Sequence, residues 1–225
     1  MSSANDILSS WEANAGNWIA TIENNELESR RLVTNNAITQ AVLALQPKTV
    51  LDLGCGEGWL SRELRKNRIE VYGTDAIAEL VELARQKDGD FYYQYSYEQI
   101  AAGEHELPSP FDLIVINFAL IDKEATENLL RYLPTLLSTN GHLVIQTLHS
   151  FTLPPDDYKT GWKEGSWTGM KREFVLPYQW YFRTLQDWIS LFSNAGFCLT
   201  DLKEPSHPET GKPLSFIFVL KLINS

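Results

Sequence analysis

Apolar and polar positions alternate along most of the chain in a pattern typical of a parallel sheet flanked by helices. From Thr49 onward, apolar runs of strand length are separated by amphipathic stretches of helical length. We predict strands at 49–53, 70–74, 91–95, 111–117, 142–148, 197–202 and 215–222. The run 111–117 is nearly all apolar, which indicates a central strand buried on both faces.

The stretches between these runs have the periodicity of helices. We predict helices over 57–67, 76–87 and 123–137, and a short polar helix or turn between 96 and 103. Asn140-Gly141 is typical of a helix C-terminus, so we expect the helix 123–137 to be closed there. Thr184 can cap a further helix, because apolar residues follow it at positions 185, 188, 189 and 192.

Two segments lie outside the alternation. Residues 1–46 read as amphipathic helices that form a cap, and residues 150–183, rich in proline, glycine and aromatics, read as an inserted lid. The last two strands are joined by the short loop 203–213, which is too short for a helical crossover, so they should pair antiparallel. We therefore expect one α/β domain over residues 1–225, with a core at 47–149 and a C-terminal helix and hairpin at 184–225.

Ligands of such sheets bind beyond the carboxyl ends of the strands, near the switch in strand order. At that rim the sequence places three alternate glycines, Gly54, Gly56 and Gly58, directly after the first strand. Glycines gather in such a turn when the backbone must bend sharply or let a ligand come close. Asp75 ends the second strand, where a carboxylate can accept hydrogen bonds from both hydroxyls of a ribose. The turn therefore predicts a nucleoside site, although a tight turn and a helix cap are the structural alternatives.

The spacing of the glycines separates two classes of nucleoside ligand. A dinucleotide turn has the order G-x-G-x-x-G, whereas here the order is G-x-G-x-G and Trp59 stands in place of the third glycine. The chain resembles a class I S-adenosylmethionine-dependent methyltransferase in four segments: 50–58, 71–75, 111–117 and 141–145. Within that family it is similar to the small-molecule O- and N-methyltransferases of the ubiquinone-biosynthesis type. The resemblance implies a three-layer, Rossmann-like sheet.

The resemblance also implies residue roles around S-adenosylmethionine. The glycines would wrap its methionine half, Asp52 would lie near the ammonium group, and Asp75 would hold the ribose. An acidic residue usual after the third strand is replaced by Ser96, which leaves the adenine contact open. The implied cofactor set is Asp52, Gly54, Cys55, Gly56, Gly58, Asp75, Ala76, Ile77, Ser96, Tyr97, Asn117, Phe118 and Ala119.

Fewer residues are candidates for contact with the molecule that accepts the methyl group than for contact with the cofactor. His149, at the end of the fifth strand, is the best-placed base of the four histidines, and a strand-end histidine bonded to the backbone is the alternative. One arginine of Glu28-Ser-Arg30-Arg31 could meet the methionine carboxylate. No acidic cluster follows the fourth strand, so no metal is expected. The aromatic residues expected at a flat or apolar acceptor are Trp11, Trp18, Tyr158, Trp162, Trp167, Tyr178, Trp180 and Tyr181. Packing is the alternative for all of them: Trp11 and Trp18 within an N-terminal helix, and the others against the sheet.

Composition and charge limit the classes of molecule that the protein is expected to bind. A net charge of −10 and a pI of about 4.9 disfavour nucleic acid and anionic membranes. Two cysteines fit a reducing cytoplasm, and no apolar run reaches the ~20 residues that span a bilayer. We expect a cytoplasmic enzyme, monomer or homodimer, acting on a small molecule. The alternatives are a protein or peptide acceptor, a nicotinamide-dependent oxidoreductase and a non-catalytic nucleoside-binding module.

Overall fold

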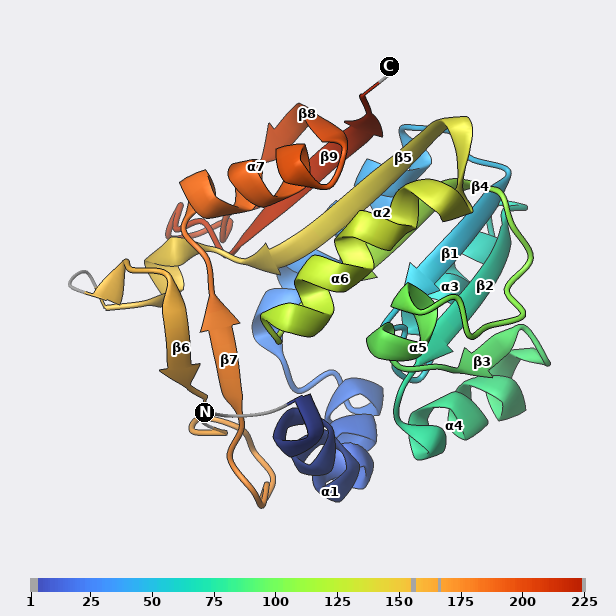
Figure 1. Ribbon diagram of the computed structural model, residues 1–225. Coiled ribbons are helices and arrows are strands. Elements are labelled where there is room, and N and C mark those ends of the chain that lie inside the picture. Colours follow the sequence, from blue (N-terminus) through green and yellow to red (C-terminus); the bar gives the residue numbers. More distant parts are fainter. Residues whose placement is uncertain (1–3, 155–156, 166, 224–225) are drawn as a thin grey trace.

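A seven-stranded sheet forms the centre of the protein (Figure 1). The computed structural model describes residues 4–154, 157–165 and 167–223, and within them the strand order is β3-β2-β1-β4-β5-β9-β8. The five strands from β3 to β5 are parallel, whereas β9 runs antiparallel to both β5 and β8. The predicted mostly parallel sheet with a C-terminal antiparallel hairpin is confirmed. The strands are β1 Thr49–Leu53, β2 Glu70–Asp75, β3 Tyr92–Gln94, β4 Phe111–Asn117, β5 Leu137–Leu148, β8 Phe197–Lys203 and β9 Ser215–Leu222.

Helices cover both faces of this sheet, as the alternation of strands and helices predicts. Side chains along β4 alternate between the faces: Ile114 and Ile116 pack with α5, α6 and α7, while Leu113 and Val115 pack with α2 and α3. β4 is therefore buried on both faces, as its apolar run predicts. The helical segments are α1 Ala4–Glu23, η1 Arg30–Thr34, α2 Asn35–Leu43, α3 Trp59–Arg65, α4 Ala78–Asp88, α5 Tyr97–Ala101, α6 Glu124–Tyr132, η2 Leu133–Leu136, η3 Ser150–Thr152 and α7 Leu185–Asn194.

The predicted helix over 123–137 is wrong at its C-terminal end. Helix α6 stops at Tyr132 and continues as the short 3₁₀ turn η2, which carries Pro134, a residue without an N–H for the helical ladder. Strand β5 already begins at Leu137, so Asn140-Gly141 lies within a strand. The register shifts here, because Phe111 pairs with Leu137 and Leu113 pairs with His142. The Asn-Gly signal thus marks a bulge in a strand instead of the end of a helix.

The N-terminal range expected as a helical cap divides into two parts. Helix α1 lies beyond the carboxyl ends of the strands, at the lower edge of the sheet in Figure 1. Helix α2 instead buries Ile38, Ala41 and Val42 against the sheet. The segment η1 between them is a π-helical turn, a rare geometry that often occurs at functional sites.

The expected lid is an excursion from the carboxyl end of β5. It contains a two-stranded antiparallel sheet, β6 Gly161–Glu164 and β7 Gln179–Phe182. Pro155 and Asp156 of this segment, and Ser166, lie outside the described residues. The loop between β6 and β7 returns to α1, where Asn14 hydrogen-bonds the backbone of Val175 and Leu176. The insertion and α1 therefore enclose the same rim of the sheet.

Candidate active site

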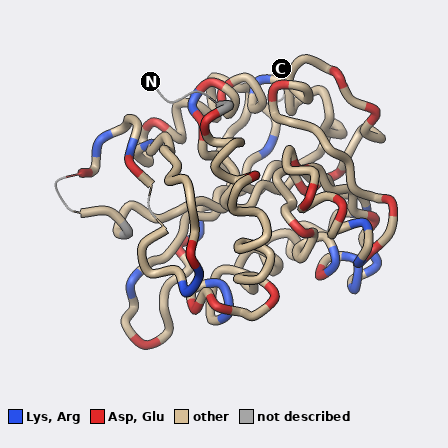
Figure 2. Tube along the Cα trace, turned by 90° about the horizontal axis from the view of Figure 1, so that it is seen from below, with Lys and Arg blue, Asp and Glu red and all other residues tan. Residues whose placement is uncertain are grey.

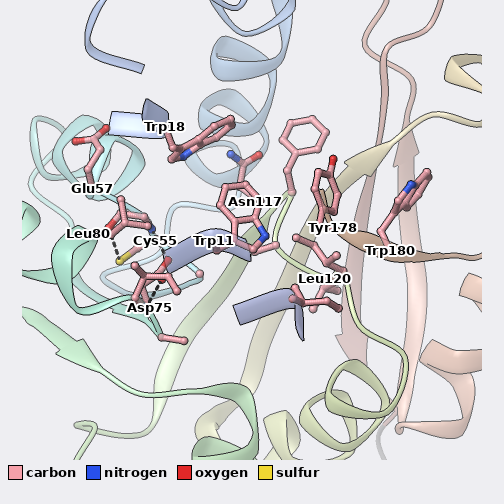
Figure 3. Close-up of a pocket in the computed structure, with 18 of the residues that line it drawn as sticks. Trp11, Trp18, Cys55, Glu57, Asp75, Leu80, Asn117, Leu120, Tyr178 and Trp180 are labelled. Carbon is pink, nitrogen blue, oxygen red and sulfur yellow. Dashed lines mark hydrogen bonds between the residues drawn. The ribbon is translucent and has the colours of Figure 1, made fainter. Parts of the chain in front are cut away.

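A cavity of about 470 Å³ lies at the rim of the sheet, where the glycine turn and Asp75 predict a ligand. Its wall contains residues from the β1–α3 turn, from the ends of β2 and β4, from α1 and from the β6–β7 loop. Figure 3 shows Glu57, Cys55 and Asp75 at one side of this cavity and Tyr178 and Trp180 at the other, with Asn117 between them. The cavity thus has a polar end and an aromatic end.

The three glycines of the β1–α3 turn adopt left-handed backbone conformations, with φ of 71° at Gly54, 57° at Gly56 and 80° at Gly58. Gly54 is required by its neighbours, because a Cβ there would lie 2.4 Å from Cβ of Ala119. Glycine is likewise required at position 58, because a Cβ there would clash with the Tyr92 ring. Gly58 does not line the cavity. Only Gly56 has open space where a Cβ would be, so it is the glycine at which a ligand can approach the backbone.

Asp75 stands beside this turn and ties it to β2. Its Oδ2 accepts a hydrogen bond from the Gly56 N–H at 2.8 Å, and its Oδ1 accepts one from the Ile77 N–H at 3.0 Å. Burial raises the pKa of Asp75, and the backbone N–H groups of Ile77, Gly56 and Ala76 oppose that rise. Asp75, Ala76 and Ile77 all line the cavity, as the resemblance implies.

Asp52 is a second buried carboxylate at the polar end, with 1% of its surface exposed. It accepts a hydrogen bond from the Ser61 hydroxyl at 2.7 Å. Burial raises its pKa to about 7, and the Ser61 hydrogen bond opposes that rise. Cys55 beside it is buried, and burial raises the pKa of its thiol further, so this residue is a small wall residue and not a nucleophile.

Arg30 brings a cation to the same end. Its guanidinium lies over the rings of Trp59 and Trp18, with its central carbon 5.1 Å and 5.8 Å from their centroids. Burial lowers the pKa of Arg30 to about 10, with Glu57 opposing the shift, so the side chain remains charged at neutral pH. Its Nη2 is buried and has no hydrogen-bond partner among the described residues. Arg31, the other expected candidate, is exposed and pairs with Glu28.

Ser96 and Tyr97 form part of the wall after β3. Ser96 caps α5: its hydroxyl accepts from the Gln99 N–H, and the Gln99 side chain accepts from the Ser96 N–H. Tyr97 extends toward the glycine turn, since its hydroxyl would be 2.8 Å from a Cβ on Gly54. That hydroxyl is buried without a partner in the described part of the chain.

Asn117 ends β4 and is followed by Phe118 and Ala119; the three residues form the floor between the two ends of the cavity. Phe118 has a left-handed backbone with φ of 56°, which turns the chain sharply away from the strand. Ala119 packs on Gly54, so the floor and the glycine turn fix each other. The three predicted residues are therefore brought to the centre of the site.

The aromatic end contains only part of the predicted acceptor set. Trp11, Trp18, Trp167, Tyr178 and Trp180 line the cavity, whereas Tyr158, Trp162 and Tyr181 do not. Adjacent residues of a strand point to opposite sides, so Trp180 and Tyr181 cannot both face the cavity. Trp162 is the register partner of Tyr181 and packs edge-on against it, away from the cavity. The Tyr158 hydroxyl accepts from the Leu185 N–H instead.

Several wall residues at the aromatic end are not in the predicted set. They are apolar or acidic residues without a distinctive motif, and their place follows only from the chain path. They are Leu120, Ile121, Asp122, Leu148 and Met170.

The structure does not bring His149 into the cavity wall. Its side chain is 2% exposed and lies against the rings of Phe216 and Phe151, at 4.0 Å and 5.1 Å between centroids. Nε2 is 2.8 Å from Oε1 of Glu204, and Nδ1 accepts from the Phe151 N–H at 3.1 Å. Both ring nitrogens are thus engaged at the end of the strand. His149, expected as a candidate base, therefore lies outside the cavity wall, whereas a general base must reach the proton that it removes.

The polar end fits S-adenosylmethionine in the chemistry of its groups. Asp52 and Asp75 are carboxylates that suit an ammonium group and ribose hydroxyls, and Gly56 leaves room beside its backbone. The unpartnered Nη2 of Arg30 suits the carboxylate of the methionine part. Among the described residues, no group of three or more His, Cys, Asp or Glu side chains is arranged to hold a metal ion.

Charge on the rest of the molecule is mixed. In Figure 2 basic positions are interspersed with acidic ones along the trace. No helix within the described residues is long and apolar enough to cross a membrane.

Comparisons with known proteins find similarity to methyltransferases. The family model described as a methyltransferase domain matches residues 28–202. A malonyl-[acyl-carrier protein] O-methyltransferase of Legionella pneumophila is 28% identical over 141 residues, which cover 59% of this chain and 47% of that protein. A ubiquinone biosynthesis O-methyltransferase of Aeromonas salmonicida is 29% identical over 114 residues, covering 50% of this chain and 48% of that protein. The chain thus spans about half the length of these curated relatives.

A solved structure shares the fold over the whole chain. It is the 1,6-didemethyltoxoflavin-N1-methyltransferase of Burkholderia thailandensis, with a TM-score of 0.68 and 15% sequence identity. The alignment covers 100% of this chain and 92% of that one. At this identity the likeness concerns the fold alone.

Proposed function

Because this chain belongs to the class I S-adenosylmethionine-dependent methyltransferases, we propose that it transfers a methyl group to an oxygen or nitrogen of a small, aromatic or apolar acceptor. One observation carries this proposal: a single cavity joins a polar end, suited to S-adenosylmethionine, to an aromatic end. The aromatic end is called the acceptor end below. It comprises Trp11, Leu120, Ile121, Asp122, Leu148, Trp167, Met170, Tyr178 and Trp180.

The chain's own residues would hold the cofactor at the polar end. Asp75 would bind the ribose, Asp52 would lie near the ammonium, and Arg30 would bind the carboxylate. Gly56 would let the methionine half lie against the backbone. When bound, S-adenosylmethionine supplies a methyl carbon on a cationic sulfur; an acceptor lone pair bonds to that carbon while the carbon–sulfur bond breaks, leaving S-adenosylhomocysteine and a proton for the solvent.

The protein would accelerate this reaction mainly by alignment and by excluding water. Well-oriented proximity can supply roughly 7–11 kcal/mol of a barrier, so a dedicated base is not obligatory. Helix α1 and the β6–β7 loop both line the cavity beside the Asn117 floor, and their apolar side chains remove water from it. The placement of His149 supports a reaction that depends on alignment, since its nitrogens are engaged elsewhere.

The walls favour a small acceptor over a protein or peptide. Trp11 packs edge-on against Trp18 and Trp167, with ring centroids 5.2 Å and 5.4 Å apart, and so joins the lid to α1. A peptide would have to displace these contacts to enter. A nicotinamide-dependent reaction is disfavoured by the G-x-G-x-G spacing of the turn.

Two measurements test the proposal. Calorimetry of the purified protein should show binding of S-adenosylmethionine and S-adenosylhomocysteine, and no comparable binding of NAD or NADH. A screen of small aromatic and heteroaromatic compounds should then detect S-adenosylhomocysteine release with at least one of them. Preferential binding of NADH would contradict the cofactor, and release only with protein substrates would contradict the acceptor class.

A further inference from the structure

The charged residues of the cavity are distributed unevenly between its ends. Arg30 is the only lysine or arginine among the described residues that line it. Arg30 lies at the polar end, where it packs on Trp59, directly after the glycine turn, and interacts with Glu57. No cation of the described chain therefore lines the acceptor end.

The acceptor end carries one charged side chain, the carboxylate of Asp122. Its Oδ1 accepts from the Ala125 N–H at 2.7 Å, which holds the group at the start of α6. The other wall residues there are aromatic or aliphatic. Arg183 interacts with Asp122 from outside the cavity wall, where its guanidinium donates to the Asp122 carbonyl at 3.4 Å. An anion placed in the cavity would therefore lose its hydration and lie near the Asp122 carboxylate with no cation in the wall to bind it, which is unfavourable.

Asn117 is a polar group at the junction of the two ends. Figure 3 shows its amide between Asp75 on one side and Tyr178 on the other. Its Oδ1 is buried and has no hydrogen-bond partner among the described residues. A buried carbonyl oxygen without a partner is costly, so such an atom in a cavity wall indicates a ligand that donates to it.

We propose that the acceptor is an uncharged, planar ring compound whose N–H or O–H donates a hydrogen bond to Oδ1 of Asn117, and that ring acids are excluded. The inference rests on the proposed function, because it assigns the polar end to the cofactor and leaves the aromatic end to the acceptor. Asn117 acts in it as a positioning residue. It selects a ring compound whose N–H or O–H is still protonated, and it turns that N–H or O–H toward the polar end of the cavity.

Equilibrium dialysis of the full chain, saturated with S-adenosylhomocysteine, tests this selection with three matched probes. β-Naphthol is uncharged and has an O–H, its methyl ether is uncharged and lacks one, and β-naphthoate is an anion of similar shape. We expect β-naphthol to bind about tenfold or more tightly than either of the other two probes. The methyl ether lacks the hydrogen bond to Asn117, and β-naphthoate brings a negative charge into the cavity.

Two variants separate a specific contact from general damage. Asn117→Leu should bring β-naphthol to within about twofold of the methyl ether while leaving the affinity for the ether unchanged. Thr126→Val is the matched control, because the Thr126 hydroxyl oxygen is also buried without a partner among the described residues but does not line the cavity. It should change none of the three affinities.

The outcomes distinguish this inference from the proposed function. Binding of β-naphthoate as tightly as β-naphthol would overturn the exclusion of anions. Equal weakening of naphthol and ether by Asn117→Leu would overturn the hydrogen bond. Failure of S-adenosylhomocysteine itself to bind would instead remove the proposed function, and that affinity is measured first.

Discussion

The two ends of the cavity are built in different ways. The polar end is made by neighbouring strands whose backbones are joined directly: the N–H groups of Gly54 and Cys55 both donate to the Thr74 carbonyl, at 2.8 Å and 2.9 Å. The acceptor end is made by segments far apart in the chain, such as Asn14 and Val175, which are 161 positions apart. A geometry set by backbone bonds between neighbouring segments can be predicted from a short motif, whereas a wall made by distant side chains cannot.

The contacts that close the acceptor end are mostly between side chains of α1 and the backbone of the β6–β7 loop. Asn14 is fully buried and bonds both Val175 and Leu176, and Ser10 donates to Leu176 at 2.7 Å. Arg172 pairs with Glu26 through two bonds, of 3.1 Å and 2.8 Å. We therefore expect changes in α1 to affect the acceptor more than the cofactor. The five variants below test this difference, beginning with the largest expected effect.

Gly54→Ala should damage the polar end most. The new Cβ would meet Ala119 and would require a left-handed backbone, so we expect the free energy of unfolding to fall by about 2–5 kcal/mol. Denaturant unfolding measures this change. Gly211→Ala is the control, since Gly211 has φ of 67° with open space around it and should lose only about 1–2 kcal/mol. Equal losses in both variants would show that the contact with Ala119 is unimportant.

Asp75→Ala should weaken S-adenosylhomocysteine binding by about 1.5–3 kcal/mol, roughly tenfold to 150-fold, because a charge-assisted hydrogen bond is lost. Calorimetry measures the affinity. Asp112 provides a matched control: its carboxylate also accepts from two backbone N–H groups, of Lys48 and Thr49, but it does not line the cavity. Asp112→Ala should leave the affinity unchanged. A similar loss in both variants would mean that Asp75 acts only through folding.

Asn14→Ala tests the acceptor end. The variant removes the Asn14 partner of the Val175 N–H and carbonyl, while the Leu176 carbonyl keeps its bonds from Ser10 and Trp167. We therefore expect a loss of about 1–3 kcal/mol in the stability of the contact between α1 and the loop. Hydrogen exchange of α1 reports it. Asn17→Ala removes one exposed bond, to the Glu173 carbonyl, and should lose less. Affinity for β-naphthol should fall while that for S-adenosylhomocysteine changes little; the reverse would contradict the division into two ends.

Asp52 gives the polar end a pH dependence. Between pH ~4 and ~7 the folded protein retains a proton that the unfolded chain has lost, because burial raises this pKa from 3.8 to about 7. The group therefore lowers the free energy of unfolding as pH rises through this window. A cationic ligand prefers the ionised carboxylate, so affinity for S-adenosylmethionine should rise about tenfold from pH 6 to pH 8. Calorimetry with Asp52→Asn should give a flat profile, and an unchanged slope would exclude Asp52 as its source.

His149→Ala should have the smallest effect on turnover. We expect kcat within about twofold of the parent protein, since a general base would contribute about 10²–10⁴-fold and His149 lies outside the cavity wall. Stability should fall by about 1–3 kcal/mol, because the ring is buried between Phe151 and Phe216 and bonded to Glu204. Steady-state kinetics and unfolding together measure both values. A hundredfold loss of kcat at unchanged stability would restore the base hypothesis.

The sequence predicts some regions of the structure better than others. The alternation of apolar runs predicts the sheet and its hairpin, because each strand is fixed by its own side chains. It misplaces the start of β5, since Asn-Gly has the same local preference in a helix end and in a bulge, and only pairing with β4 distinguishes them. The aromatic content of 150–183 indicates an apolar wall but not which rings face the cavity.

The amino-acid sequence by itself determined the chemistry of the polar end. Gly54, Gly56 and Asp75 lie within one strand–turn–helix unit and its neighbouring strand, so short-range sterics and backbone bonding set their positions. Only the tertiary structure decided that His149 bonds Glu204, that Trp180 and not Tyr181 lines the cavity, and that Oδ1 of Asn117 is left without a partner among the described residues. These positions depend on packing between segments distant along the chain, which local residue preferences do not specify.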